Sequence, residues 1–265
     1  NLMMSDNASE NVISLTNDYV KNYARLYFRP KTPTQFHTEG YKPSHIRNKN
    51  INALCPVPIF FCLDALSVLN MDGTGFVEKG LAGKQYRQIK TGVEDFSKLN
   101  FEKIYHDGSY NNEDQGDIKN YRQSEVVRAN GFPIEGCLKK ILCRSIPEKQ
   151  TLLYLLKKNY PDKYKKLYKK IEYMPQLNLF YNNGIFIKDI FYKDNIINFV
   201  FNDKEIRFNK EKANNKDLSM KVTLFWLDNK TEKIINVESF SGKIDYKNYE
   251  RATCKLTKKV SDKVI

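Results

Sequence analysis

The sequence predicts an α+β fold in which helices and strands mix in the first two thirds of the chain and an antiparallel β unit fills the rest. Tyr23 to Phe28 has the aromatic, alternating character of a strand. Apolar residues recur at helical spacing within 151–171. Short β-rich runs separated by Asn, Asp, Lys and Gly turns follow. We therefore expect two domains, comprising residues 1–177 and 178–265.

The strands expected in the first domain are bounded by proline and by polar turns. Arg29-Pro30 closes the strand that begins at Tyr23, and Cys55 to Leu63 is rich enough in β-formers to make a second, buried strand. The polar run 105–121 is expected to be a long loop, and loops of that length are usually functional or mobile. A further strand is expected to start near Gln123, where an apolar, β-branched run begins.

Two short helices are expected on either side of Pro161, because proline ends a helix at the preceding residue. Their apolar positions are Leu152, Leu155 and Leu156 in the first, and Tyr164, Leu167, Tyr168 and Ile171 in the second. The β-rich runs of the second domain are 184–191, 196–201, 220–226 and 233–237. This second domain contains no cluster of catalytic residue types, so we expect a scaffold, an interaction surface or an additional nucleic-acid contact.

Basic residues outnumber acidic ones, with 44 Lys and Arg against 31 Asp and Glu and a net charge of +13. Residues 1–138 are electrically neutral, whereas 139–170 hold 11 basic and only 2 acidic side chains. A basic segment of this kind attracts polyanions such as nucleic acid. The equally open alternative is a solvated lysine face on surface helices.

Several classes of protein are disfavoured by what the sequence lacks. No apolar run reaches the roughly 18–20 residues that cross a bilayer, and no secretory leader opens the chain, so we expect a soluble, cytoplasmic protein without a membrane partner. The cysteines are odd in number and lie in apolar contexts, so we expect reduced, buried thiols and no metal. They are Cys55, Cys62, Cys137, Cys143 and Cys254. Nucleophile elbows and phosphate-binding glycine loops are also missing.

The candidate chemistry lies in Gln123-Ser124-Glu125, which follows the polar run 105–121. In a strand, Gln123 and Glu125 project from the same face, because side chains alternate. Glu125 could then stabilise a cationic sugar transition state or hold a ribose hydroxyl, while Gln123 orients the nucleophile. The alternative is an exposed glutamate at a strand edge.

Two blocks of sequence resemble the DarT family of DNA ADP-ribosyltransferase toxins. The first runs from Tyr23 through Tyr27-Phe28-Arg29-Pro30-Lys31-Thr32-Pro33 to Phe36, and the second from Ile118 to Glu125, followed by 138–156. The resemblance implies an ADP-ribosyltransferase-like split β-sheet with flanking helices over 1–177. It also implies NAD as co-substrate, single-stranded DNA as target and a macrodomain antitoxin, DarG, as partner.

Carried over by position, the resemblance makes Glu125 the catalytic glutamate and Gln123 its neighbour in the loop that receives the target base, expected over about 86–125. The residues that it implies for DNA binding are Lys31, Thr32, Pro33, Thr34, Gln35, Phe36, Tyr105, His106, Lys119 and Arg122. The NAD-binding residues, including an important arginine, are expected mostly upstream of Asn1. Arg25 and Arg29 lie in the strand block and are not assigned to that role.

We therefore expect a toxin of a bacterial toxin–antitoxin or phage-defence system that transfers ADP-ribose from NAD to a base in single-stranded DNA. The extended second domain favours guanine over thymine as the target. Two other hypotheses stay open: a non-catalytic protein that binds single-stranded nucleic acid through 139–170, and a structural, β-rich interaction protein whose lysines merely solvate it.

Overall fold

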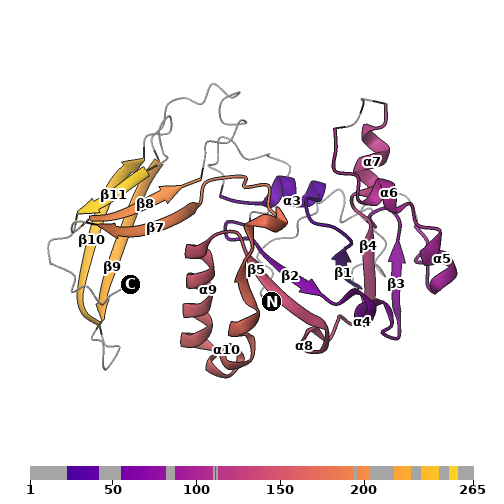
Figure 1. Cartoon of the computed structure of the whole chain (residues 1–265), viewed down its shortest axis with the longest axis horizontal. Coiled ribbons are helices and arrows are strands. Elements are labelled where there is room, and N and C mark those ends of the chain that lie inside the picture. The colour runs from indigo at the N-terminus through magenta and orange to yellow at the C-terminus, as the bar shows by residue number, and fades with distance from the viewer. Residues whose placement is uncertain are drawn as a thin grey trace. The chain divides into compact units, whose positions relative to one another are not determined.

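The structure, a computed structural model, describes these parts of the chain: 23–41, 55–81, 87–109, 111, 113–193 and 196–202, together with the backbone of strands at 218–227, 234–244 and 251–255 (Figure 1). The chain divides into two compact units. The first comprises Asn1–Arg144 and Glu148–Gly184, and the second comprises Ser145–Pro147 and Ile185–Ile265. Residues 178–184 therefore fall in the first unit, whereas the sequence placed the domain boundary before them.

A three-stranded antiparallel sheet in the first unit holds β1 (Tyr23–Tyr27), β4 (Glu125–Ala129) and β3 (Thr74–Val77), with β4 in the centre. Glu125 is paired with Tyr27 on one side and with Val77 on the other. Val77, Val127 and Leu81 form a buried cluster on one face. The predicted strand at Tyr23–Phe28 is confirmed, and Glu125 begins the middle strand of this sheet.

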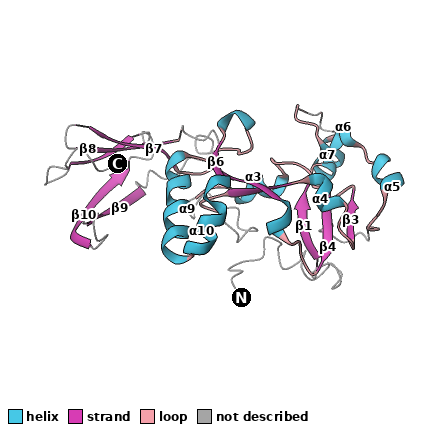
Figure 2. Cartoon of the chain, turned by 60° about the horizontal axis from the view of Figure 1, so that its bottom comes forward, coloured by secondary structure: helices cyan, strands magenta, loops and turns pink. Residues whose placement is uncertain are grey.

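A second three-stranded sheet in the same unit holds β2 (Ile59–Leu63), β5 (Leu138–Cys143) and β6 (Ile171–Tyr173). The central strand β5 runs antiparallel to β2 and parallel to β6. Helices α9 (Ile146–Asn159) and α10 (Pro161–Leu167) lie beside it (Figure 2). Their apolar side chains pack on the cluster built from this sheet, and they are Leu152, Leu153, Leu156 and Leu167. The two predicted helices on either side of Pro161 are confirmed.

Short helices connect the strands of the first unit. They are α3 (Pro33–Thr38), α4 (Ala65–Leu69), α5 (Val93–Ser97), α6 (Phe101–Ile104), α7 (Gln115–Tyr121) and α8 (Ile134–Cys137), with 3-10 turns at Tyr168–Lys170 and Pro175–Leu177. Side-chain caps start several of them. Asp64 caps α4 by accepting from the backbone N–H and the hydroxyl of Ser67, and these hydrogen bonds lower the pKa of Asp64 to about 2. These elements and the two sheets confirm the predicted α+β fold.

The second unit is antiparallel β structure. Strands β7 (Ile187–Lys193), β8 (Ile196–Phe201) and β11 (Arg251–Lys255) form one sheet in the order β11-β8-β7. A long hairpin pairs β9 (Leu218–Leu227) with β10 (Ile234–Ile244). Each predicted β-rich run overlaps one of these strands, because alternation and turn residues are local signals.

Three local expectations are wrong. The run 105–121 is not one loop, since it ends in α7, which buries a single apolar side chain, Ile118, and so shows no helical stripe. Ile171 does not continue a helix, because it pairs with β5 as the start of β6. Cys55 is exposed and lies before β2, which begins only at Ile59, and Cys62 is half-buried because β2 is an edge strand; the buried strand expected over Cys55 to Leu63 is thus shorter and less buried.

Candidate active site

The carboxylate of Glu125 is buried at the start of β4, with only 3% of the residue exposed. Its Oε2 accepts a hydrogen bond of 3.1 Å from the backbone N–H of Leu81. Its Oε1 lies 3.9 Å from Nη1 of Arg25. A buried carboxylate requires such partners to remain charged. The alternative of an exposed glutamate at a strand edge is therefore wrong.

Burial raises the pKa of Glu125 above its ordinary value, because desolvation disfavours the charged form. The charge of Arg25, the hydrogen bond from Leu81 and the charge of Arg87 act in the opposite direction. A carboxyl group whose pKa is shifted by burial beside a specific cation is typical of functional sites. This position can hold or release a proton at a pH nearer neutrality than an ordinary glutamate.

Arg25 is a site residue that the sequence reasoning set aside. The pairing of β1 with β4 places Tyr27 directly opposite Glu125, and Arg25 lies two residues before Tyr27 in the same strand. Because side chains alternate along a strand, Arg25 and Tyr27 share the face on which Glu125 projects. The signal in the sequence is the spacing of two in a predicted strand, but only the pairing register shows which carboxylate it faces.

Gln123 lies outside β4, so the expectation that it opens the strand is wrong. Its backbone N–H donates to the carbonyl of Asn120, and its Nε2 donates to the carbonyl of Lys119 at 3.2 Å. The hydroxyl of the buried Ser124 binds the carbonyls of Tyr121 and Glu78. These bonds hold the turn that delivers Glu125 into the sheet, and the catalytic role of Gln123 stays a prediction.

The segment from Lys31 to Phe36 forms the turn before α3 and the helix itself. Thr32 is buried, and its Oγ1 caps α3 by accepting from the N–H of Gln35 at 3.1 Å. Thr34 accepts at its Oγ1 a hydrogen bond of 3.3 Å from the hydroxyl of Tyr27, which links α3 to the residue opposite Glu125. Pro33 occupies the first turn, where its missing N–H costs nothing.

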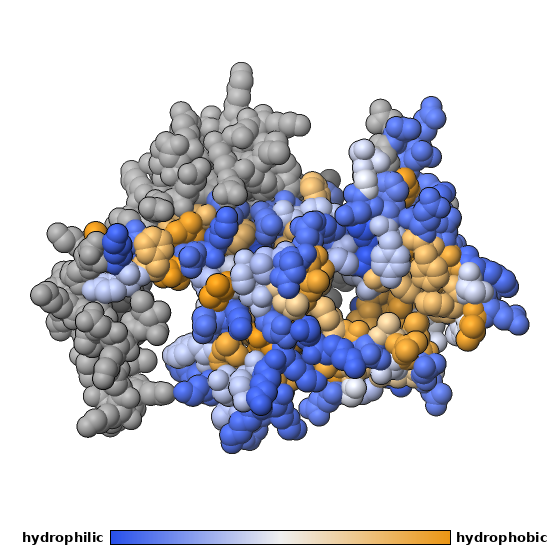
Figure 3. Space-filling view, in the orientation of Figure 1, coloured by the Kyte–Doolittle hydropathy of each residue, from blue (hydrophilic) through white to orange (hydrophobic). Residues whose placement is uncertain are grey.

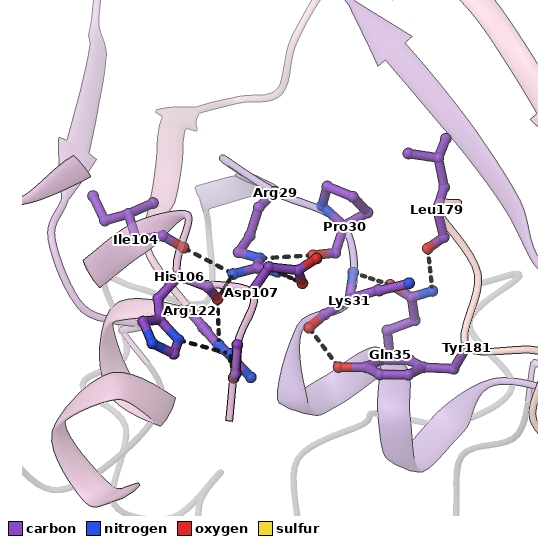
Figure 4. A network of polar contacts seen from close by, with 11 residues as sticks. Arg29, Pro30, Lys31, Gln35, Ile104, His106, Asp107, Arg122, Leu179 and Tyr181 are labelled. Carbon is purple, nitrogen blue, oxygen red and sulfur yellow. Dashed lines mark hydrogen bonds and ion pairs between the residues drawn. The ribbon is translucent and has the colours of Figure 1, made fainter. Parts of the chain in front are cut away.

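Lys31 has a left-handed backbone, with φ of 57°. Its N–H donates to Oε1 of Gln35 at 2.6 Å, and its carbonyl accepts from the hydroxyl of Tyr181 at 2.6 Å. Figure 4 shows both bonds, with the ring of Tyr181 lying beside the Gln35 side chain. A non-glycine residue in this region costs about 1–2 kcal/mol, so these two bonds offset a real cost.

Residues 179–183, near the end of the first unit, hold α3 in place through hydrogen bonds and ring packing. We call this segment the clamp. Glu39 is 1% exposed, and its two oxygens accept from the backbone N–H groups of Tyr181 and Asn183 at 3.0 and 3.1 Å. Gln35 donates to Glu39 and to the carbonyl of Leu179. The rings of Phe36 and Tyr181 meet edge to face at 5.3 Å. The expected DNA-contact segment is therefore held rigidly, by residues that the sequence did not single out.

Two arginines, Arg29 and Arg122, donate hydrogen bonds to the backbone carbonyl of His106 (Figure 4). Arg29 is buried, and it donates to the carbonyls of Ile104 and His106 and to the carboxylate of Asp107 at 3.0 Å. Arg122 donates to the His106 carbonyl at 2.9 Å, and its Nη2 lies 3.1 Å from Nδ1 of the His106 ring. The structure thus brings His106 and Arg122 together.

The other expected DNA-contact residues differ in how far they are exposed. Tyr105 is 51% exposed, although its hydroxyl donates to the carbonyl of Phe28 at 3.3 Å and its ring stacks on Phe101. Lys119 lies exposed on α7. Both have the accessibility that contact with an oligonucleotide requires, whereas Thr32 acts as a helix cap.

The described part of the chain shows neither a metal centre nor a membrane span. No three His, Cys, Asp or Glu side chains among these residues gather closely enough to hold a metal ion. None of the helices that the structure describes is both long and apolar enough to cross a membrane.

Comparison with known proteins identifies the class to which this fold and site belong. The family model described as "ssDNA thymidine ADP-ribosyltransferase, DarT" matches residues 4–181. The chain therefore belongs to the DarT family of ADP-ribosyltransferases that act on single-stranded DNA. The match covers both sequence blocks, the site at Glu125 and the clamp up to Tyr181.

Solved structures of low sequence identity are also similar to the chain. Thermus sp. 2.9 DarT in complex with carba-NAD+ has 14% identity and a TM-score of 0.44, over 61% of this chain and 74% of that chain. Thermus sp. 2.9 DarT in complex with ADP-ribosylated ssDNA has 13% identity and a TM-score of 0.49, over 67% and 82%. A comparison with curated proteins yields no match.

Proposed function

We propose that this chain transfers ADP-ribose from NAD to a base in single-stranded DNA, with Glu125 as the catalytic carboxylate. The observation that carries the proposal is the burial of Glu125 beside Arg25, on the central strand of a sheet that lies within the family match. A carboxylate shielded from water interacts more strongly with positive charge that develops in a transition state.

NAD is the co-substrate of this proposal, and Glu125 and Arg25 are the described residues that would act on it. When bound, NAD supplies the ADP-ribose: the bond from ribose C1′ to nicotinamide breaks and a bond from C1′ to a base nitrogen forms. Glu125 stabilises the positive charge that develops at C1′ and accepts the proton that the base nitrogen gives up. Arg25 favours the ionised form of that carboxylate, and 38% of the Arg25 side chain is exposed. The guanidinium of Arg29 already donates hydrogen bonds to the carbonyls of Ile104 and His106 and to the carboxylate of Asp107.

Single-stranded DNA suits this site because a base inside a duplex is not accessible, and extruding it costs a few kcal/mol. The exposed ring of Tyr105 offers a stacking face, and Lys31, Lys119 and Arg122 offer charge to phosphates. Gln123, which lies just before Glu125, would orient the base nitrogen. The identity of the NAD-binding residues stays a prediction.

The target base and the biological role are finer parts of this proposal. We favour guanine over thymine because of the extended second unit, whereas the description of the family names thymidine. Toxicity in the bacterial cytoplasm, reversed by a macrodomain antitoxin of the DarG type, completes the proposal. Oligonucleotides that lack guanine or lack thymine decide the base: modification is expected to vanish with the guanine-free strand.

The alternative is a protein that binds single-stranded nucleic acid without catalysis, which the basic segment 139–170 favours. It predicts salt-dependent binding that is indifferent to NAD and to Glu125→Gln. Incubation of the folded protein with NAD and a mixed-sequence oligonucleotide separates the two. A gain in DNA mass by one ADP-ribose supports the transferase, whereas binding without any mass gain supports the alternative.

A further inference from the structure

Three tyrosines lie in and beside helix α10 on the surface of the first unit. Tyr160 is the residue before the helix, Tyr164 lies within it, and Tyr168 begins its 3-10 extension. Tyr164 and Tyr168 are stacked, with ring centroids 5.4 Å apart. Tyr160 is 58% exposed and Tyr168 is 40% exposed. Aromatic rings on a helix usually pack into the core, so exposed rings need a reason.

Lysines accompany these rings. Lys163 lies 5.5 Å from the centroid of Tyr160, and Lys169 lies 5.8 Å from that of Tyr168. A third pair, at the end of α9, has Lys158 5.7 Å from the ring of Tyr154, which is 53% exposed. We call this set the tyrosine–lysine surface. It comprises Tyr154, Lys158, Tyr160, Lys163, Tyr164, Tyr168 and Lys169.

The acidic residues of the segment that holds this surface already have cationic partners. The segment 139–172 holds three acidic residues, and each already faces a cation. Glu148 pairs with Arg144 in the interior, Asp162 lies 3.4 Å from Lys165, and Glu172 lies 2.7 Å from Lys140. Figure 3 shows a mainly hydrophilic surface over α9 and α10.

We propose that the tyrosine–lysine surface is a second contact for single-stranded DNA, which holds the strand away from the base that is modified. Proteins that bind single strands without sequence preference combine lysines for phosphates with aromatic faces for successive bases. A duplex hides the faces of its bases, so paired DNA would use only the lysines. A simpler explanation for Lys158 is that the dipole of α9 attracts cations to its carboxyl end. That explanation does not account for the exposed tyrosines.

The inference rests on the proposed function in taking single-stranded DNA as the ligand. It adds that a long strand contacts both the active site and the tyrosine–lysine surface, whereas a short strand contacts only one of them. Binding measured without NAD keeps the two claims apart. Wild type that binds oligonucleotides but fails to modify them contradicts the proposed function alone.

The first test removes three charges from the tyrosine–lysine surface. K158Q/K163Q/K169Q is compared with K98Q/K188Q/K193Q, a control with the same net charge whose lysines lie outside the segment 139–170. Affinity for an oligonucleotide of about 30 nucleotides and for one of about 6 is measured across salt concentrations. Loss of three phosphate contacts lowers the salt slope by about 2 for the long strand only.

The second test removes rings, with Tyr160→Ala and Tyr168→Ala combined. Each lost stacking contact weakens binding about fivefold or more, so the affinity for the long strand falls while that for a duplex of the same sequence is unchanged. Unfolding curves show whether this variant folds, and the lysine variants decide the matter if it does not. Equal slopes for the two triple variants would overturn the proposal, as would binding to anionic phosphatidylglycerol vesicles without binding to the long strand.

Discussion

The hydroxyl of Tyr181 donates a hydrogen bond of 2.6 Å to the carbonyl of Lys31, a residue 150 positions earlier in the chain. Together with Gln35, Tyr181 holds Lys31 in its left-handed conformation and so fixes where that lysine projects. Loss of the hydroxyl alone leaves the ring that packs on Phe36 in place. Tyr181 is therefore a positioning residue for the expected DNA-contact segment.

Tyr181→Phe is expected to raise the KM for DNA about fivefold, the equivalent of one hydrogen bond of about 1 kcal/mol, with little change in kcat. Tyr173→Phe, in β6, is the matched control. In a background of Lys31→Ala the Tyr181→Phe effect should disappear, because the tyrosine then has no side chain to position. Additive effects of the two substitutions on KM would show that Tyr181 acts independently of the Lys31 side chain, which contradicts the positioning role.

Gly40 lies where α3 meets the clamp, and its φ is +81°. A Cβ there would lie 1.8 Å from the carbonyl oxygen of Asn183, so Gly40→Ala must displace backbone. Gly73 has a similar φ of +75° but open space around it, so Gly73→Ala carries only the conformational cost of about 1–2 kcal/mol. Urea unfolding is expected to show Gly40→Ala less stable than Gly73→Ala by about 2 kcal/mol or more. Equal losses in the free energy of unfolding would mean that the backbone of the clamp can shift away from the new Cβ at little cost.

Arg25 lies 3.9 Å from Glu125 and lowers the pKa of that carboxyl against the effect of burial. Arg25→Gln removes this charge, so the pKa of Glu125 is expected to rise further. If the ionised carboxylate is the active form, the acid limb of the kcat/KM profile then shifts to higher pH. The control is Lys98→Gln, which removes an exposed charge at α5. An unchanged acid limb would separate Arg25 from the chemistry of Glu125.

Burial of Glu125 also links stability to pH. Its folded-state pKa is raised above the unfolded value, so the stability that it contributes is fully present below the unfolded pKa and is lost as pH rises through the folded pKa. Glu125→Gln does not titrate. The variant is therefore expected to gain stability relative to wild type as the pH rises from the unfolded pKa through the folded pKa of Glu125, measured by urea unfolding. A difference that is constant with pH would contradict the raised pKa.

The sequence predicted those elements that depend on neighbouring residues. β1 and the two helices around Pro161 follow from alternation and from helical spacing, which are local patterns. Helix α7 was missed because it buries only Ile118, so its polar residues look like a loop. The run at 171 was mistaken for helix because its pairing partner, Ile141, lies in another strand.

The residues of the site also differ in whether a local sequence pattern or only the folded chain reveals them. The family resemblance singled out Glu125, whose burial the structure shows, while its catalytic role stays a prediction. Its partner Arg25 could not be found from the sequence, because the register of β1 against β4 decides which side chains meet. Tyr181 and Glu39 lie far apart in sequence, and their bond forms only when the chain closes on α3. Contacts between distant segments leave no periodic signal.

The central claim is that Glu125 carries the transfer of ADP-ribose to DNA. Wild type and Glu125→Gln are incubated with NAD and a single-stranded oligonucleotide, and the mass of the DNA is followed over time. We expect wild type to add one ADP-ribose, and Glu125→Gln, which keeps the size of the side chain, to act at least about 100-fold more slowly while binding the strand equally well. Equal rates in the two proteins would contradict the account.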